Sequence, residues 1–167
     1  AILSGLVGSE MCIRDSFGGA HVSTLLPYDS KRKEIVLIQQ FRAGVISRYD
    51  EDYLLEIVAG IIDGNESPEE TAKRECFEET GCIVNKIIPI QGYFPAPGSS
   101  ESYYHLFLGE VDAFDGERIK GLENENENIL VKSYGVEEVR GMLSRGEIKN
   151  GLTLIALQWF FLEYFKN

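Results

Sequence analysis

The sequence predicts one mixed α/β domain in which a sheet lies between helices. The chain has 167 residues, which is the length of one ordinary domain and is enough to bury a core. Segments rich in Val, Leu and Ile recur between turn residues, and three other segments carry helical signals. Neither an internal repeat nor a long linker interrupts this order of elements, so a single domain is expected.

The first strands of the expected sheet surround a turn near the N-terminus. Residues 20–26 and 34–40 are rich in Val, Leu and Ile, and the segment 27–30, which begins with a proline, lies between them. This pattern predicts two strands joined by a turn. Residues 53–59 are a third strand candidate, which ends at Gly60.

A helix is predicted over residues 67–80 by signals at both of its ends. Ser67 can cap the N-terminus, Pro68 fits the first helical position, and Glu70 completes a capping box with Ser67. Gly81 follows the last turn, where a glycine commonly ends a helix.

The rest of the chain supplies further strands and two more helices. Strands are predicted at residues 83–93, 103–111 and 129–134, a polar acidic loop at 121–128, and helices at 136–144 and 152–165. In the last helix, apolar residues recur at helical spacing and predict a face packed on the core: Leu154, Leu157, Phe161 and Phe165.

The charge and cysteine content exclude several classes of partner. The chain carries 27 acidic and 16 basic residues, a net charge of −11, which argues against binding to nucleic acid. No apolar run reaches about 18 residues, so no membrane span is expected. Cys12, Cys76 and Cys82 are too few and too irregularly spaced for a disulfide framework, which favours a reducing, cytoplasmic setting. An acidic enzyme can still bind phosphates when metal ions lie between the negative charges.

Residues 1–16 show neither a helical nor a strand period, and we expect the domain to span residues 17–167. The apolar start is too short for a secretory signal and lacks the basic region of one. The stretch LVGSEMCIRDS resembles a translated sequencing adapter, so we hypothesise that the natural sequence begins near Phe17. A short disordered leader is the alternative interpretation.

Seven residues between the third strand candidate and the end of the first helix form a fixed pattern. They follow the spacing G-x5-E-x7-R-E-x2-E-E-x-G and are Gly60, Glu66, Arg74, Glu75, Glu78, Glu79 and Gly81. With an average usage of about 6% per residue type, such a match arises by chance at about one starting point in 10⁸ or fewer.

Three carboxylates of this pattern lie together on the predicted helix. Glu75 and Glu79 are i,i+4 neighbours, and Glu78 lies beside them. They repel one another, and they lie in the last turns, where the helix dipole disfavours negative charge. A hard divalent cation such as Mg²⁺ would relieve both penalties, and Arg74 can pair with Glu78 at i,i+4. The glutamates alone would favour a solvated acidic helix face; the flanking glycines, the capping box and Arg74 favour function.

The pattern resembles the Nudix box, and every fixed position of that motif is matched. The resemblance implies the Nudix-type α/β/α sandwich, with a mixed sheet between helices, and hydrolysis of a nucleoside diphosphate linked to another moiety. It implies Mg²⁺ as the cofactor, with Mn²⁺ as an alternative. The site residues that it implies are the metal ligands Glu75, Glu79 and the Ala59 carbonyl, the catalytic Glu78, and Gly60 in contact with substrate.

The resemblance extends from about Phe17 to the C-terminus and is strongest to the bacterial ADP-ribose pyrophosphatase group. It rests on the segments IVLIQQFR at 35–42, LLEIVAGII at 54–62, GLENENEN at 121–128 and LIALQW at 154–159. Pro97, sixteen residues beyond Gly81, also marks that group. Pro97, Gly98 and Glu101 are therefore expected to contact substrate. Ala96 stands where serine is common, and Glu101 is one position closer to the proline than usual.

The base that takes a proton from the attacking water is expected on the acidic loop, at Glu123, Glu125 or Glu127. Matching the segment to the group favours Glu125 as the base and Glu127 as an extra metal ligand. Without the resemblance, this segment would be interpreted as a solvated polar loop.

Arg42 follows an apolar strand, and its guanidinium fork fits a phosphate or a ribose. The alternative is a surface cation at a strand end. His105 alternates with apolar neighbours and is expected to be structural. Nearby aromatic residues are expected in the core or in a pocket wall: Tyr93, Phe94, Tyr103 and Tyr104.

The predicted reaction is the Mg²⁺-dependent hydrolysis of ADP-ribose to AMP and ribose 5-phosphate, so the predicted partner is a small-molecule nucleoside-diphosphate sugar. One alternative is a hydrolase of another such compound, ADP-glucose or GDP-mannose. Another is a Nudix-fold module that binds a nucleotide without cleaving it, which the intact glutamates oppose. Members of the group usually carry N-terminal strands that build a homodimer. We expect these strands to be absent from this chain or replaced by residues 1–16, and we expect a homodimer when the protein is full length.

Overall fold

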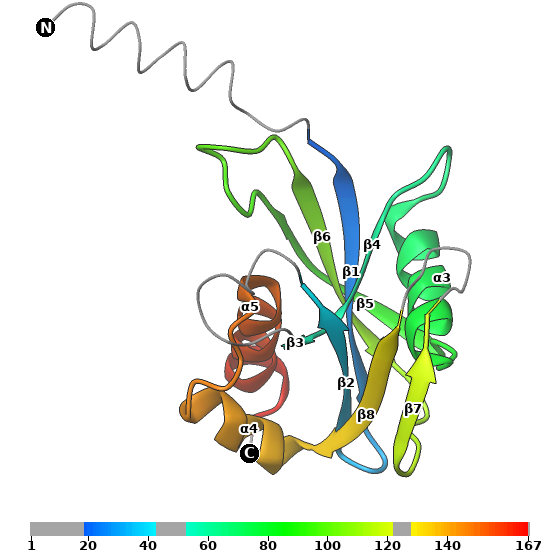
Figure 1. Ribbon diagram of the computed structural model, residues 1–167, viewed down its shortest axis with the longest axis vertical. Coiled ribbons are helices and arrows are strands. Elements are labelled where there is room, and N and C mark those ends of the chain that lie inside the picture. The colour runs from blue at the N-terminus through cyan, green and yellow to red at the C-terminus, as the bar shows by residue number, and fades with distance from the viewer. Residues whose placement is uncertain (1–18, 43–52, 122–127, 167) are drawn as a thin grey trace, which may run out of the picture.

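The computed structural model describes residues 19–42, 53–121 and 128–166. Within these, α3 (Pro68–Thr80) covers one face of a sheet, and α4 (Val136–Ser144) and α5 (Gly151–Trp159) cover the other (Figure 1). A π-helical turn, η2 (Phe160–Tyr164), continues α5. The predicted α/β class, with a sheet between helices, is confirmed.

The described part of the chain contributes eight strands to one sheet. They are β1 (His21–Asp29), β2 (Glu34–Phe41), β3 (Tyr53–Glu56), β4 (Val58–Ile61), β5 (Lys86–Tyr93), β6 (Tyr103–Glu110), β7 (Glu117–Lys120) and β8 (Ile129–Gly135). Six of them run in the order β5-β6-β1-β2-β8-β7, while β3 pairs with β2 and β4 pairs with β1. The β1–β6 pair is parallel and the other pairs are antiparallel, so the sheet is mixed.

The central strand β2 is buried on both faces. Ile35 and Leu37 pack into the core under α4 and α5, whereas Val36 and Ile38 pack into the core under α3. Because successive side chains of a strand point to opposite faces, this continuous apolar run fills both cores. Burial of each such side chain contributes about 1.5–3 kcal/mol.

The first strand is longer than the sequence indicates. β1 continues through Pro27, and the turn to β2 lies at residues 30–33 rather than 27–30. The ladder from β1 to β4 covers Val22–Leu25, and the ladder to β2 begins at Tyr28. On this edge of β1, Pro27 lies between two ladders, whereas on the other edge it lies opposite Gly109 of β6.

The strand predicted at residues 53–59 is two strands with different partners. The change occurs at Ile57, whose N–H donates to the Thr153 hydroxyl oxygen of α5 at 3.1 Å. β3 ends with Glu56 and β4 contains Ala59, and both of these residues line the cavity described below.

Both predicted ends of α3 are confirmed. The Ser67 hydroxyl oxygen accepts from the Glu70 N–H at 3.3 Å, and Glu70 Oε2 accepts from the Ser67 N–H at 2.8 Å, which completes the capping box. Gly81 adopts a positive φ of 73° and donates its N–H to the Phe77 carbonyl at 2.8 Å. Only glycine adopts this conformation at little cost.

The remaining elements agree with the predictions, with shifts at some ends. α4 matches its predicted bounds, β5 begins at Lys86 rather than at 83, and the last helix starts at Gly151 and becomes a π-helical turn at Phe160. β7 was not predicted. Residues 1–16, the suggested leader, lie outside the described residues. No helix in the described part of the chain is long and apolar enough to cross a membrane.

Candidate active site

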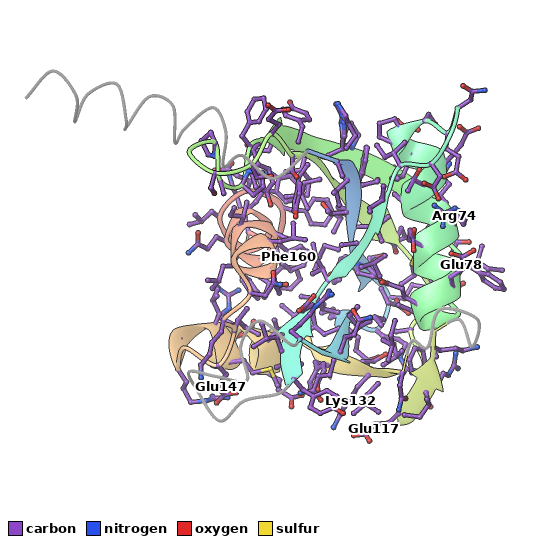
Figure 2. The ribbon with its side chains drawn as sticks, turned by 45° about the horizontal axis from the view of Figure 1, so that its top comes forward. Arg74, Glu78, Glu117, Lys132, Glu147 and Phe160 are labelled. Carbon is purple, nitrogen blue, oxygen red and sulfur yellow. The ribbon has the colours of Figure 1, made fainter. Side chains whose placement is uncertain are left out.

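Arg74 is the centre of a carboxylate cluster on α3. Its Nη1 donates to Glu75 at 2.8 Å and to Glu78 at 2.9 Å, and its Nε donates to Glu66 at 3.0 Å. The predicted i,i+4 pair of Arg74 and Glu78 is therefore confirmed, and Figure 2 shows both residues on α3, across the sheet from Phe160. The arginine holds two helix glutamates and ties the loop before the helix to them.

Glu66 is the residue of the pattern whose role becomes clear only in the structure. Its carboxylate accepts from Arg74 and from the Thr71 hydroxyl at 2.8 Å. These hydrogen bonds, chiefly that from Arg74, hold the pKa of the Glu66 carboxyl below its ordinary value. Glu66 thus stays ionised and fixes Arg74 from the side opposite the helix glutamates.

Gly60 lies on β4 against the side chain of Glu75. A Cβ atom at this position would lie 1.9 Å from Glu75 Oε1, far inside van der Waals contact. A side chain at this position would have to displace the Glu75 carboxylate, which fills the space that it would take. The structure thus brings Gly60 to the cluster, as the pattern suggests.

Glu79 is the buried member of the cluster, with 5% of its surface exposed. Its Oε2 accepts from the Ala59 N–H at 3.3 Å. Glu79 and Ala59, the residues predicted to share a metal, are therefore in direct contact through this hydrogen bond.

The donor set fits a hard divalent cation. Glu75, Glu79 and the Ala59 carbonyl offer only oxygen atoms, which Mg²⁺ and Mn²⁺ accept, and Gly60 leaves the space that brings Glu75 next to β4. In residues 19–42, 53–121 and 128–166, no group of three Asp, Glu, His or Cys side chains is arranged so that it could hold a metal ion. Metal ligation by these residues therefore stays a prediction.

A cavity of about 470 Å³ lies next to the cluster, and Ala59 is part of its wall. Its other lining residues come from the ends of β2 and β3, from the β5–β6 region and from the start of α5: Arg42, Leu54, Glu56, Tyr93, Pro95, Tyr104, Asn150, Gly151, Leu152 and Ile155. A space of this size accommodates a nucleoside or a sugar phosphate.

Arg42 and Glu56 form an ion pair in this cavity wall. Arg42 Nε donates to Glu56 Oε1 at 2.9 Å, and Nη2 donates to Oε2 at 2.6 Å. Arg42 was predicted as a ligand for phosphate or ribose, and the structure places it in the cavity. Sequence reasoning missed Glu56. The available signal was one carboxylate inside the apolar run LLEIV.

The four aromatic residues expected in the core or a pocket wall divide between two faces. Tyr93 and Tyr104 line the cavity with ring centroids 5.7 Å apart. Phe94 is 56% exposed and packs against Tyr103, which also contacts His105. Burial raises the pKa of Tyr93 to about 12.

Other predicted site residues lie elsewhere or outside the described residues. Pro97, Gly98 and Glu101 lie on an exposed loop and do not line the cavity, although Pro95 at the start of that loop does. Glu123, Glu125 and Glu127 lie outside the described residues.

His105 lies on β6 beside the other histidine, His21, with ring centroids 5.9 Å apart. Burial, with a smaller contribution from His21, lowers the pKa of His105 below its ordinary value. The neutral ring packs among the aromatic residues of the sheet, which suits the structural role expected for it.

The sequence matches one family model and is similar to several proteins of known name. A family model described as "NUDIX domain" matches residues 19–153. The chain is 38% identical over 151 residues to an ADP-ribose pyrophosphatase of Escherichia coli strain K12, covering 90% of this chain and 72% of the relative. It is 34% identical over 164 residues to that of Haemophilus influenzae, covering 96% and 73%.

A GDP-mannose pyrophosphatase of Shigella flexneri is 30% identical over 148 residues, covering 87% of this chain and 76% of the relative. A crystal structure described as an ADP compounds hydrolase superposes with a TM-score of 0.64 at 19% identity. It covers 84% of this chain and 72% of that chain, and it supports the fold.

Proposed function

The chain belongs to the NUDIX domain family, and from this premise we propose that it is a Mg²⁺-dependent hydrolase that splits ADP-ribose into AMP and ribose 5-phosphate. The observation that carries the proposal is the complete carboxylate cluster, held by Arg74, next to the cavity that contains Arg42. The relatives named ADP-ribose pyrophosphatase, at 34–38% identity, support this substrate.

Pyrophosphate hydrolysis requires neutralisation of the phosphate oxygens and an activated water. We assign Mg²⁺ binding to Glu75, Glu79 and the Ala59 carbonyl, with Glu127 as a further ligand. A divalent cation held by these residues would supply charge neutralisation for the phosphate oxygens and a lower pKa for a bound water.

The chain's own side chains orient the substrate and move the proton. Arg42 binds a phosphate or ribose of the substrate in the cavity, because its guanidinium fork matches those groups. Arg74 fixes the carboxylates of Glu75 and Glu78, so Glu78 acts in the site from one defined position. Glu125 takes the proton of the attacking water.

The alternative substrate class is another nucleoside-diphosphate sugar, and the relative named GDP-mannose pyrophosphatase favours it. A binding module without catalysis is the weaker alternative, because each glutamate of the cluster is present. We also propose that the protein is cytoplasmic and that it is a homodimer; light scattering of the purified protein tests the oligomeric state.

The test is an assay for AMP and ribose 5-phosphate with ADP-ribose and Mg²⁺, with ADP-glucose and GDP-mannose in parallel. We expect release of AMP that depends on Mg²⁺ or Mn²⁺ and is lost in Glu79→Gln. A matched control is Glu69→Gln, because Glu69 is exposed on the first turn of the same helix, away from the cluster. Faster cleavage of GDP-mannose would move the assignment to that substrate, and no cleavage of any of the three would contradict a hydrolase.

A further inference from the structure

We propose that Glu56 is a positioning residue, which fixes the guanidinium of Arg42 in the cavity wall so that Arg42 meets a phosphate of the bound nucleotide. The proposal rests on the function proposed above, which gives Arg42 a ligand and Glu56 no role.

The geometry of the pair defines both the position and the plane of the guanidinium. Glu56 is the last residue of β3 and lies opposite Ile38 of β2, whereas Arg42 follows the end of β2. The arginine side chain reaches back along the sheet and donates from Nε and Nη2 to the two carboxylate oxygens. Two parallel hydrogen bonds of this kind leave the guanidinium one orientation.

The two partners differ in exposure, and this difference indicates which of them meets a ligand. Glu56 is 3% exposed, whereas the Arg42 side chain is 44% exposed. Both residues line the cavity, and Arg42 is the more accessible partner to a ligand there.

Stability alone does not account for an ion pair at this place. The neighbours of Glu56 in sequence, Leu55 and Ile57, pack into the apolar core. Apolar residues of similar volume in place of a buried ion pair are often neutral or stabilising. A local rule broken beside a cavity is typical of a functional group.

The position of the cavity indicates which part of the substrate Arg42 meets. Ala59 belongs to the same wall, and its N–H donates a hydrogen bond to Glu79 of the carboxylate cluster. A ligand that spans the cavity and the cluster presents its phosphates between Arg42 and the helix glutamates. Held at this point, the guanidinium of Arg42 is oriented for charge-assisted hydrogen bonds with an anionic phosphate.

The discriminating variant is Glu56→Gln, which keeps the length of the side chain and removes its charge and one acceptor. We expect the Kd of ADP-ribose, measured by calorimetry in EDTA so that no turnover occurs, to rise about 10-fold. KM is expected to rise to a similar extent with kcat changed less than about 2-fold, since uniform binding is lost. The melting temperature is measured for each variant.

The matched control is Glu147→Gln, because Glu147 forms the same type of two-point pair with Arg145 at 2.5 and 3.3 Å, exposed and outside this cavity. We expect Glu147→Gln to bind ADP-ribose with the same Kd as the parent protein. An unchanged Kd in Glu56→Gln would overturn the proposal, whether or not its melting temperature falls.

A double-variant cycle separates positioning from direct contact. If Glu56 acts through Arg42, Arg42→Gln/Glu56→Gln binds ADP-ribose as Arg42→Gln does, within about 2-fold. A further 10-fold loss in the double variant would show that Glu56 contacts the ligand itself and would overturn positioning. The neutral pair also keeps hydrogen-bonding partners, so the double variant guards against a folding failure of Glu56→Gln alone.

The outcomes distinguish this proposal from the proposed function. If the parent cleaves ADP-ribose and Glu56→Gln binds it equally well, only the positioning role fails. If the parent binds ADP-ribose without cleaving it and Glu56→Gln binds more weakly, the hydrolase assignment fails and the positioning role stands. If the parent neither binds nor cleaves it, both fail.

Discussion

At the scale of single residues, the site depends on one absent side chain. Gly60 is the point at which β4 approaches α3, and the Glu75 carboxylate lies where a Cβ atom would be. Because residue 60 has no side chain, the Glu75 carboxylate can lie here, beside the hydrogen bond between Ala59 and Glu79.

Gly60→Ala is expected to displace Glu75 and to abolish Mg²⁺-dependent activity, because the new methyl group overlaps Oε1. Overpacking of this kind costs about 1–3 kcal/mol of stability, which urea denaturation measures. The matched control is Gly135→Ala, since a Cβ at Gly135 meets nothing within 4 Å and its φ is −60°. Full activity in Gly60→Ala would contradict the close approach.

Tyr93 offers a residue-scale test of stability. Its hydroxyl oxygen is buried and has no hydrogen-bond partner among the residues that the structure describes. An unsatisfied buried hydroxyl costs about 1–3 kcal/mol, so Tyr93→Phe is expected to leave the free energy of unfolding unchanged or to raise it by about 1 kcal/mol. A loss of more than about 1 kcal/mol, beyond that of Tyr104→Phe, would mean that the hydroxyl is satisfied in solution.

At the scale of elements, the turn between β1 and β2 is fixed by one buried carboxylate. Asp29 is 2% exposed and accepts from the N–H groups of Lys31, Arg32 and Ala113 at 2.8–2.9 Å. Burial alone raises the pKa of this carboxyl, but the backbone donors outweigh burial and hold the pKa below its ordinary value. Through the Ala113 N–H, Asp29 thus links this turn to the segment that follows β6.

This shift predicts a contribution to acid unfolding. Since the pKa of Asp29 is lower in the folded state, its stabilisation is complete above the unfolded value near 3.9 and is lost as the pH falls through the folded value. Asp29→Asn is expected to lose about 1–3 kcal/mol at pH 7 and to lose less stability than the parent between pH 7 and pH 3. Urea unfolding at the two pH values measures this, and equal losses would contradict it.

Elements with strong local signals could be predicted, and those set by distant partners could not. Capping residues and apolar periodicity place α3 and α4 correctly. β7 escaped prediction because all four of its side chains are exposed and show no apolar alternation. The division at Ile57 escaped it because no turn residue separates the two halves of this segment, and the sequence does not show that they pair with different strands.

The same distinction applies to the candidate site. The contact of Arg74 with Glu78 follows from i,i+4 helix spacing and could be predicted, whereas its contact with the adjacent Glu75 does not follow from that spacing. The Arg42–Glu56 pair joins side chains from two strands, and the cavity needs Leu152 and Ile155 from α5 as well. Such groupings depend on the tertiary arrangement, which no local pattern carries.

At the scale of the whole molecule, a site built on the folded arrangement couples metal binding to folding. Three of the proposed ligands, Glu75, Glu79 and the Ala59 carbonyl, come from β4 and α3, and these elements meet only in the native state. A ligand that binds only the folded protein at about 100 times its Kd stabilises it by about 2.7 kcal/mol. We therefore expect Mg²⁺ at that excess to raise the melting temperature by about 5–10 °C.

Scanning calorimetry with Mg²⁺ and with EDTA measures this shift. Glu79→Gln is expected to lose it and Glu69→Gln to keep it, because Glu69 lies outside the cluster. An equal rise in both variants would show that the stabilisation arises elsewhere on the protein.

The parallel pairing of β1 with β6 has a consequence for biosynthesis. Contacts such as Ala20 with Ser102 and Thr24 with His105 join residues about 80 positions apart. At about 5–20 residues per second, a ribosome needs roughly 4–16 s to supply β6 after β1 has emerged. During that interval Leu25 and Leu26, which are fully covered in the finished sheet, have no β6 beside them. Nascent chains of this protein should therefore recruit holdase chaperones until about residue 110 has left the exit tunnel.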